Sequence, residues 1–276
     1  MKIEDFTFVI TTFNSESTIF KCLEKLPKES KKIILENSSN KNLKNSLENN
    51  FENLHCYIMK KNLGFGKANN FGIKKAKTKY ICILNPDVSL ENDSFENIIK
   101  IIKNEEFSIA APIHIEEIGK FEFNQNKVLE VNYVKGFAMI MKKSEVIKNL
   151  FDENIFLYLE EIDLCKRFKK KNNRIILVDV PVKHSGGLSH GNRDDMEMEK
   201  SRNWHWMWSK FYFNKKYYGY LYSFFILLPS LLSSMIKFFL YKITGNQKKK
   251  NVYKMRFLGL INSYLLKSSF YRPCKK

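Results

Sequence analysis

The first 90 residues alternate short apolar segments with helical ones, and this alternation limits the possible folds more than any other feature. Four segments rich in β-branched and aromatic residues are predicted strands: Phe6–Thr12, Lys32–Leu35, Leu54–Met59 and Tyr80–Leu84. Three helices are predicted between them, one capped by Ser17 and ending near Leu26, one over about 41–49 and one over about 67–76. Short connections between alternating strands and helices predict an α/β domain with an open, mostly parallel sheet flanked by helices.

Each predicted strand is followed by polar residues. They are Phe13-Asn14, Glu36-Asn37, Asn62 with Gly64 and Gly66, and Asn85 with Asp87. The carboxyl ends of parallel strands lie on one edge of a sheet, where open α/β sheets bind ligands. Asn85-Pro86-Asp87 alone is more often a turn that ends a strand, but four such polar turns together predict a ligand site. The 62–66 loop has no GxGxxG pattern and no phosphate-loop Lys-Ser/Thr, so it indicates neither a dinucleotide site nor an ATPase site.

Charge is distributed unevenly along the 276 residues. From Ser201 onward there are 15 Lys and Arg and no Asp or Glu, which leaves 32 basic against 29 acidic residues, or +3, for residues 1–200. The same segment holds all 3 Trp and 20 of the 39 aromatic residues. We therefore expect a near-neutral domain followed by a basic, aromatic segment suited to an anionic surface.

The five Cys residues are scattered without CxxC or paired spacing, which argues against a zinc site or a disulfide framework. Three of them lie in apolar segments, and we expect these to be buried thiols in a reducing compartment. The N-terminal residues do not form a signal-peptide pattern. The sequence therefore predicts a cytosolic or cytosol-facing protein.

Residues Tyr217–Ile236 carry no charge over 20 positions and are flanked by Lys215-Lys216 and Lys237. This length could just span a bilayer, although Pro229 and several serines weaken that interpretation. Helices lying at the cytoplasmic face, with aromatic residues at the level of the lipid headgroups and lysines on anionic lipid, fit equally well. A helical flap over the core of the preceding domain is the third alternative. We favour peripheral attachment.

Seven motifs occur in an order and at spacings that resemble the family 2 glycosyltransferases of the GT-A fold, and above all their rhamnosyltransferase-like bacterial members. They are TTFNS, ENSSN, NLGFGKANNFGI, YICILNPDV, VKGFAMIMKKS, FLYLEEIDLCKRF and VKHSGGLS. The resemblance covers about residues 5–190. It implies that the near-neutral domain over 1–200 is catalytic, with a nucleotide-sugar half over about 1–90 and an acceptor half over about 91–200. From its composition we expect residues 201–276 to form a membrane-associated helical tail. The resemblance also implies transfer of a sugar from a nucleotide-activated donor with inversion.

The resemblance implies a divalent metal site. Asp87 corresponds to the metal-contacting carboxylate of the family's DxD-type motif, and Asn85 stands where many relatives have an acid. His184, which follows the strand-like segment 174–178 and Asp179-Val180-Pro181, matches a family histidine that can reach the metal. One carboxylate with waters and diphosphate oxygens suits Mg²⁺ or Mn²⁺, and imidazole favours Mn²⁺.

Three acids begin a predicted helix that runs from Glu161 to about Lys170. Acids in a first turn often only complement the helix dipole. Relatives usually have Glu-Asp where this chain has Glu160-Glu161, and the second acid is the base. The resemblance thus implies Glu161 as general base, with Glu160 and Asp163 in acceptor binding or support.

The remaining site residues also follow from the resemblance. Residues implied to contact the nucleotide sugar are Thr11, Phe13, Asn14, Glu36, Asn37, Asn62, Gly64, Phe65, Gly66, Asn69 and Asn85. Glu36 stands where relatives usually have Asp. On the acceptor side, Gly136 would let backbone approach the acceptor closely, beside Glu160.

Two classes of function remain. The first is a metal-dependent inverting glycosyltransferase at the cytoplasmic face of the inner membrane, using a dTDP- or UDP-sugar (rhamnose-like or another hexose) and a polyprenyl-diphosphate-linked glycan in surface polysaccharide synthesis. The second is an inactive nucleotide-sugar-, glycan- or nucleic-acid-binding protein, whose basic aromatic tail could stack on single strands. The long uncharged segment suits phosphates poorly, so no nucleic acid is expected. A glycoside hydrolase with paired carboxylates would have no use for the strand-end turns.

Overall fold

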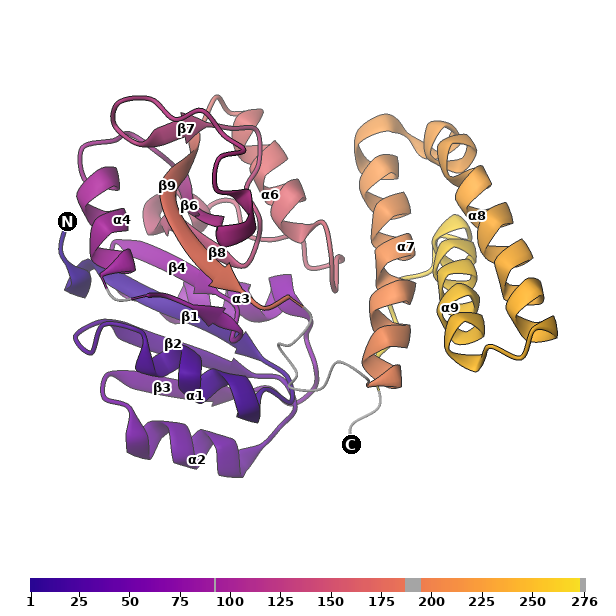
Figure 1. Cartoon of the computed structure of the whole chain (residues 1–276), viewed down its shortest axis with the longest axis horizontal. Coiled ribbons are helices and arrows are strands. Elements are labelled where there is room, and N and C mark those ends of the chain that lie inside the picture. The colour runs from indigo at the N-terminus through magenta and orange to yellow at the C-terminus, as the bar shows by residue number, and fades with distance from the viewer. Residues whose placement is uncertain (92, 187–194, 274–276) are drawn as a thin grey trace. The chain divides into compact units, whose positions relative to one another are not determined.

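The computed structural model describes residues 1–91, 93–186 and 195–273. The chain forms two compact units, one of Met1–Phe151 with Glu161–Arg193 and one of Asp152–Glu160 with Asp194–Lys276 (Figure 1). The chain therefore enters the second unit briefly at Asp152 and returns to the first at Glu161. The assignment of a catalytic domain to 1–200 and a tail to 201–276 stays a prediction.

The first unit is built on one sheet with strand order β3-β2-β1-β4-β8-β6-β9-β5, and β7 pairs with β9 (Figure 1). The strands are β1 (Phe6–Thr12), β2 (Lys31–Glu36), β3 (Leu54–Ile58), β4 (Tyr80–Leu84), β5 (Val88–Ser89), β6 (Ile109–His114), β7 (Val128–Glu130), β8 (Ala138–Lys142) and β9 (Ile175–His184). The β3-β2-β1-β4 half is parallel throughout, as predicted. Beyond β4 the sheet is mixed, because β8 runs antiparallel to both β4 and β6.

Helices follow most strands of this unit. They are α1 (Glu16–Glu24), α2 (Lys41–Asn50), α3 (Phe65–Lys75), α4 (Ser94–Ile102), α5 (Lys143–Val146) and α6 (Glu160–Lys169), with short 3₁₀ turns η1 (Ile3–Asp5) and η2 (Ile115–Glu117). The predicted cap at Ser17 is wrong, because α1 already begins at Glu16 and Ser15 precedes it. The Ser15 hydroxyl bonds to the backbone of Phe13 instead of to the helix, so it closes the turn after β1.

The strand predicted over 174–178 is longer than expected. It forms β9, which continues through Asp179 to His184, so His184 lies at the end of a strand. The parallel register between β6 and β9 shifts between Pro112 and Ile113, and this irregularity accommodates the additional residues of β9.

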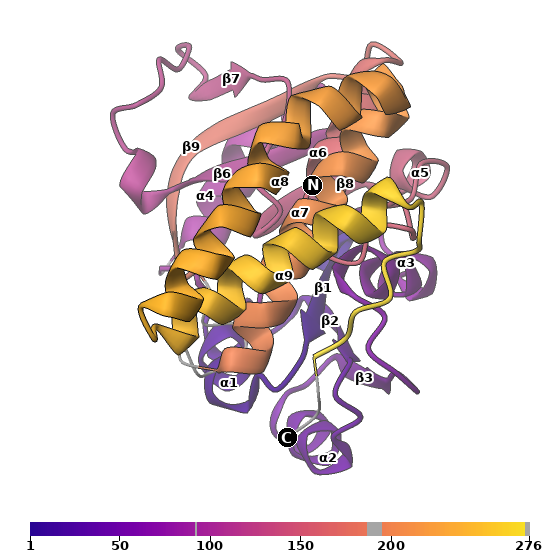
Figure 2. The same cartoon turned by 90° about the vertical axis from the view of Figure 1, so that its right-hand side faces the viewer.

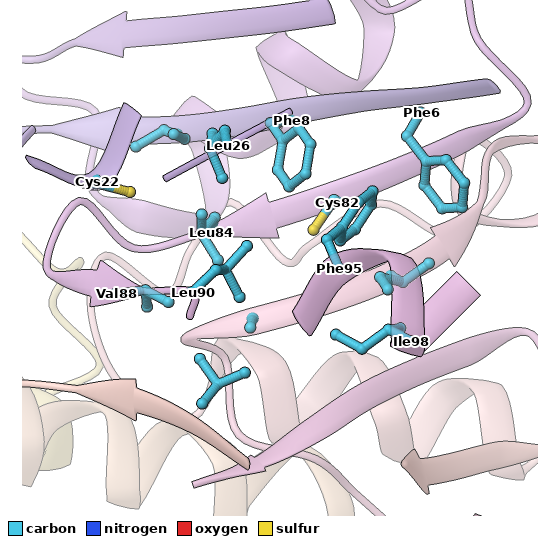
Figure 3. Packing of buried hydrophobic residues seen from close by; sticks show 14 of the residues in the cluster. Phe6, Phe8, Cys22, Leu26, Cys82, Leu84, Val88, Leu90, Phe95 and Ile98 are labelled. Atoms are coloured by element: carbon cyan, nitrogen blue, oxygen red, sulfur yellow. The ribbon is translucent and has the colours of Figure 1, made fainter. Parts of the chain in front are cut away.

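Both faces of the sheet are buried, which explains the nearly continuous apolar strands. Along β1, Phe8 packs into one cluster and Val9 into the other. Figure 3 shows the first cluster, in which Phe8 lies against Phe95 at a ring-centroid distance of 4.7 Å. Each such buried side chain contributes roughly 1.5–3 kcal/mol to stability. Four buried Cys residues, including Cys22 and Cys82, are free thiols, as the absence of paired spacing predicted.

The second unit contains three long helices, α7 (Met196–Tyr218), α8 (Tyr220–Ile243) and α9 (Gln247–Tyr264) (Figure 2). Gly219, with φ of +88°, separates α7 from α8, so the uncharged segment Tyr217–Ile236 belongs to two helices. At Gly259 of α9 an added Cβ would lie 2.3 Å from the carbonyl oxygen of Trp204, so this glycine lets α7 and α9 approach closely.

Three aromatic residues of α7 lie in the core of the unit and are not available for a surface at the level of the lipid headgroups. Trp204, Trp208 and Phe211 are at least 96% buried, because they fill the core between α7 and α9 instead. Most of the exposed aromatic and aliphatic side chains of this unit lie on α8, where Leu221 and Phe225 are 70% and 63% exposed, but Trp206 and Tyr218 of α7 are exposed as well.

A buried histidine connects the ends of the second unit. His205 accepts a hydrogen bond from the Ser269 hydroxyl (3.0 Å) and donates one from Nε2 to the Tyr271 carbonyl (2.8 Å), which the neutral imidazole satisfies. Burial lowers the pKa of His205 to about 3. The folded state therefore favours the uncharged ring, and protonation opposes folding.

We expect the second unit to lose stability as the pH falls below about 6.5, the unperturbed value for histidine. Because the folded-state pKa is depressed, the stabilisation is complete above 6.5 and falls by at most about 1.4 kcal/mol per pH unit on acidification. Chemical unfolding followed by Trp fluorescence measures this unit specifically, since all 3 Trp lie in α7. Between pH 6.5 and 5.5 most carboxylates stay ionised, so histidines are the main groups that titrate in this window. His205→Gln keeps a donor for the Tyr271 carbonyl but cannot titrate, so the free energy of unfolding of this variant should not change with pH in this window. If it fell as steeply with pH as that of the wild type, His205 would not be the group responsible.

Candidate active site

The glycine loop after β3 is fastened to the end of β2. The Asn37 side chain donates to the carbonyl of Gly64 (3.5 Å) and accepts from the N–H of Leu63 (3.3 Å). Asn62 Oδ1 accepts from the Gly64 N–H at 3.0 Å, and Gly64 has a φ of +79° that favours glycine. These bonds bring together two of the predicted strand-end turns. The glycine loop then continues directly into α3.

The end of β1 reaches the same place. The Thr11 hydroxyl donates to Asn69 Oδ1 of α3 at 3.2 Å. Asn69 is fully buried, and its Nδ2 has no hydrogen-bond acceptor among residues 1–91, 93–186 and 195–273. A buried amide without an acceptor costs about 1–3 kcal/mol, so a ligand oxygen at this position would relieve the cost. Gly66 is buried on the same helix, and Phe65 packs edge-on against Phe151.

Three other residues that were predicted to contact the nucleotide sugar, Phe13, Asn14 and Glu36, lie in or directly before the turns that follow β1 and β2. Asn14 adopts a φ of +50° directly after Phe13. The fully buried Glu36 carboxylate accepts the N–H groups of Ser38 (3.0 Å) and Asn40 (2.9 Å), so it closes the turn after β2. Glu36 thereby orders the polar edge, and its contact with a ligand stays a prediction.

Asp87, Asn85 and His184 form one cluster. His184 Nε2 lies 3.3 Å from Asp87 Oδ1 and 3.2 Å from Asn85 Nδ2. The antiparallel pairing of β5 with β9 places Val88 opposite His184 and so brings the two predicted metal residues together. Phe137 stacks on the His184 ring at 5.0 Å, which fixes the orientation of the imidazole.

This cluster suits a divalent cation that is shared with a ligand. The described residues contain no group of three or more His, Cys, Asp and Glu side chains that could hold a metal alone. Asp87 and His184 offer one carboxylate and one imidazole, a mixed set that fits Mn²⁺ when diphosphate oxygens and water complete the coordination. The nearby Cys22 is buried, and its burial, aided by the charge of Asp87, raises the pKa of its thiol to about 12.

Glu161 lies against backbone at Gly136. An added Cβ at Gly136 would lie 3.3 Å from Cβ of Glu161, so a side chain there would crowd the acid. Burial raises the pKa of Glu161, and backbone hydrogen bonds from its own N–H and that of Ile162 offset part of this effect. A carboxylate with a raised pKa is a better proton acceptor.

The other two acids differ in their surroundings. Asp163 is fully buried and accepts from Arg167 Nε at 2.8 Å, while Arg167 also donates to the Leu150 carbonyl at 2.8 Å. Asp163 therefore anchors α6 to the preceding loop. Glu160 is 4% exposed and is the first residue of α6.

Contacts inside the first unit connect the metal cluster with Glu161. Gly136 touches Glu161, the next residue Phe137 stacks on His184, and the Phe137 carbonyl accepts from the N–H of Asn85 (2.9 Å). Phe137 was not among the predicted site residues, although it lies in the motif VKGFAMIMKKS. His114 was not predicted either, and its Nε2 lies 3.0 Å from the His184 carbonyl. No sequence motif surrounds His114, so its position beside His184 follows only from the pairing of β6 with β9.

A cavity of about 350 Å³ adjoins Phe137 in the same unit. Its lining includes Glu117, Phe121, Val131, Tyr133 and Lys135. Lys135 and Glu117 form an ion pair at 2.7 Å on its wall. Its size falls within the range of pockets that bind small molecules.

The chain is similar to several known proteins. The family model described as glycosyl transferase family 2 matches residues 7–158. Rhamnosyltransferase WbbL of Escherichia coli K12 is 25% identical over 236 residues, covering 71% of this chain and 88% of the relative. The minor teichoic acid biosynthesis protein GgaB of Bacillus subtilis is 27% identical over 169 residues, which cover 56% of this chain but only 19% of that protein.

A solved structure supports the fold. Mannosyltransferase PcManGT from Pyrobaculum calidifontis, in complex with GDP-Man and Mn²⁺, has a TM-score of 0.56 at 12% identity and covers 94% of this chain and 86% of its own. The predicted α/β fold of GT-A type is confirmed. Because the family model spans more than half of the 276 residues, the chain belongs to glycosyl transferase family 2.

Proposed function

We propose that this protein is an inverting, divalent-metal-dependent glycosyltransferase that moves a hexose from a nucleoside-diphosphate sugar to a lipid-linked glycan. The observation that carries the proposal is the connected set of contacts from Asp87 and His184 through Phe137 and Gly136 to Glu161. A leaving-group site and a proton acceptor within one unit are what transfer to a hydroxyl requires.

The donor is assigned to the polar edge formed by β1, β2 and the glycine loop. Thr11, Asn37 and Asn69 converge there through the hydrogen bonds described above. The similarity to a rhamnosyltransferase favours a dTDP- or UDP-linked hexose such as rhamnose. The buried Asn69 amide is the group best placed to donate to a donor oxygen.

Asp87 and His184 would hold Mn²⁺ or Mg²⁺. When bound, the ion would neutralise the charge that develops on the departing nucleoside diphosphate. The Asp87 residue is 7% exposed, and a buried carboxylate is stabilised by a neighbouring cation. The structure of PcManGT contains Mn²⁺, which is consistent with this assignment.

Glu161 acts as the general base in this proposal. Its carboxylate takes the proton of the acceptor hydroxyl as that oxygen forms a bond to the anomeric carbon and the bond to the diphosphate breaks. A single displacement of this kind inverts the anomeric centre. Glu160 and Asp163 support the acceptor side, with Asp163 fixing α6 through Arg167.

The helices of the second unit give the protein an apolar surface. One helix among the described residues, Tyr220–Ile243, is long and apolar enough to cross a membrane. Exposed side chains recur along it at helical spacing: Leu221, Phe225, Leu232, Ile236, Phe239 and Ile243. Its other face packs on α9, which carries Lys248, Lys249 and Lys250, and these charges oppose entry of the pair into hydrocarbon.

We therefore place α8 in the plane of the cytoplasmic face of the inner membrane, with the lysines on anionic lipid. This location brings the site to a polyprenyl-diphosphate-linked acceptor of surface polysaccharide synthesis, in line with the teichoic acid relative. An inactive binding protein is less well supported, because such a protein has no need for a base candidate connected to the metal cluster.

One class of nucleotide sugar should raise the melting temperature of the protein only when Mn²⁺ or Mg²⁺ is present. A ligand at 100 times its Kd adds about 2.7 kcal/mol of stability. Thermal unfolding with dTDP-, UDP- and GDP-sugars, each with and without metal, measures this effect. Asp87→Asn should lose the metal-dependent part, while Asp93→Asn, a change at an exposed carboxylate, should retain it. A folded protein that no donor stabilises would refute the proposal.

Gly136→Ala should lower the turnover number about tenfold without changing donor affinity, because the new methyl group displaces Glu161. Glu161→Gln should lower it about 100- to 10,000-fold, the range expected for loss of a general base. Steady-state kinetics and donor titrations separate the two quantities. Glu122→Gln removes an exposed carboxylate and serves as the control. Near-normal turnover of Glu161→Gln, or an inactive Glu160→Gln, would show that the base is another residue.

The full chain should float with vesicles that contain phosphatidylglycerol. Replacing Phe225, Ile236 and Phe239 together by Ser should reduce the bound fraction at least tenfold, because each exposed apolar side chain would gain stabilisation by entering the interface. The control is Ile118→Ser, which changes an apolar residue of the first unit that is 58% exposed. Equal flotation of the triple variant and the wild type would exclude α8 as the lipid-binding surface.

A further inference from the structure

The segment that leads into α6 has an unusual backbone. Tyr158 and Leu159 have φ of +70° and +69°, and they directly precede Glu160, the first residue of α6. Two consecutive residues with side chains seldom adopt the left-handed conformation, because the Cβ crowds the following carbonyl. Such a conformation persists only where surrounding structure holds it, and it often occurs at functional sites.

The surrounding structure is one face of α7. His205, Ser209, Tyr212 and Lys216 are spaced four, three and four residues apart, so they lie along a single side of that helix. We name these four residues the α7 stripe. Every member contacts the segment 152–159, and all of these contacts lie within the second unit.

The segment is bound at its beginning by charge. Asp152 Oδ2 accepts from the Tyr212 hydroxyl at 3.0 Å and from Lys216 Nζ at 2.7 Å. Burial alone would raise the pKa of Asp152, but hydrogen bonds from Lys216 and Asn154 keep it below its usual value. Asp152 is therefore held as a charged, multiply bonded anchor.

The segment is also bound at its centre and end. Phe156 stacks on His205 at 4.4 Å and carries the Arg272 guanidinium 3.8 Å above its ring. The Ser209 hydroxyl donates to the carbonyl of Leu157 at 2.8 Å. Tyr158 packs edge-on against Trp206 at 5.5 Å, and burial raises its pKa to about 12.

We propose that the α7 stripe is a positioning device for the acceptor-side acids. By holding residues 152–159, it maintains the left-handed turn that sets where α6 begins and where Glu160 and Glu161 point. The stripe residues touch no reacting atom and act through these two acids. The inference rests on the proposed role of Glu161, and it assigns the second unit a part in the reaction beyond membrane attachment.

The donor contacts do not involve the stripe. Thr11, Asn37, Asn69 and Asp87 are held by strands and loops of the first unit. Loosening the stripe should therefore reduce turnover without weakening donor binding. A merely structural defect would affect both quantities.

The test is the full-length double variant Ser209→Ala/Lys216→Met. Its turnover number should fall at least tenfold, its donor Kd should stay within twofold of the wild type, and amide exchange over 156–163 should become at least tenfold faster. Ser209→Thr keeps the hydroxyl and should retain turnover within threefold. Lys210→Met removes a charge from α7 outside the stripe and should change neither turnover nor exchange.

A second change tests the backbone argument. Adding Leu159→Gly to the double variant should restore much of the turnover, because glycine adopts the left-handed conformation without a steric cost. No recovery would overturn the role assigned to the left-handed turn.

The remaining outcomes separate the two hypotheses. Wild-type turnover and exchange in the double variant, or an equal loss of turnover and donor affinity, would overturn the inference. A wild-type protein that transfers no sugar would refute the proposed function instead, and hydrogen exchange would still show whether the stripe holds the segment.

Discussion

The parallel hydrogen bonding of β1 with β2 and β4 is the interaction on which the site depends. It sets Thr12 beside Glu36 and Ile10 beside Leu84, so that all three strands end at one edge. Backbone pairing consumes the polar groups of the strands, and the apolar side chains fill both faces of the sheet. The polar residues that follow each strand then have no place in the core, and they meet at the edge.

Two antiparallel pairings complete what the parallel half begins. β8 pairs with β4 so that Ala138 lies beside Leu84, which carries the Gly136-Phe137 pair to the end of β4. β9 pairs with β5 so that His184 lies beside Val88, one residue after Asp87. Residues far apart in the sequence thereby become neighbours, and the proposed acceptor residues are joined to the proposed donor-binding edge of the sheet.

In the second unit some aromatic residues form the core and others stay exposed on the surface. Trp204, Trp208 and Phe211 are needed for its core, and Gly259 permits the close helix packing that buries them. Most of the apolar side chains that stay exposed in this unit lie on α8. One face of α7 meanwhile binds the segment before α6. The same helix thus stabilises its own unit and orders the entry to the predicted catalytic acids.

Sequence alone determined the α/β class, the strands of the parallel half nearly to the residue, and the family, since these follow from local periodicity and short contiguous motifs. It also indicated that the strand ends would meet, because parallel strands share an edge. Only the tertiary structure decided that His184 ends a strand beside Asp87, that Phe137 stacks on it, and that Trp204 and Trp208 of α7 are buried while Trp206 is exposed. It likewise revealed the left-handed pair Tyr158-Leu159. These features depend on pairings between segments that are distant in the sequence. Such pairings are decided by how entire strands and helices pack against each other, and a local pattern of residues does not predict that packing.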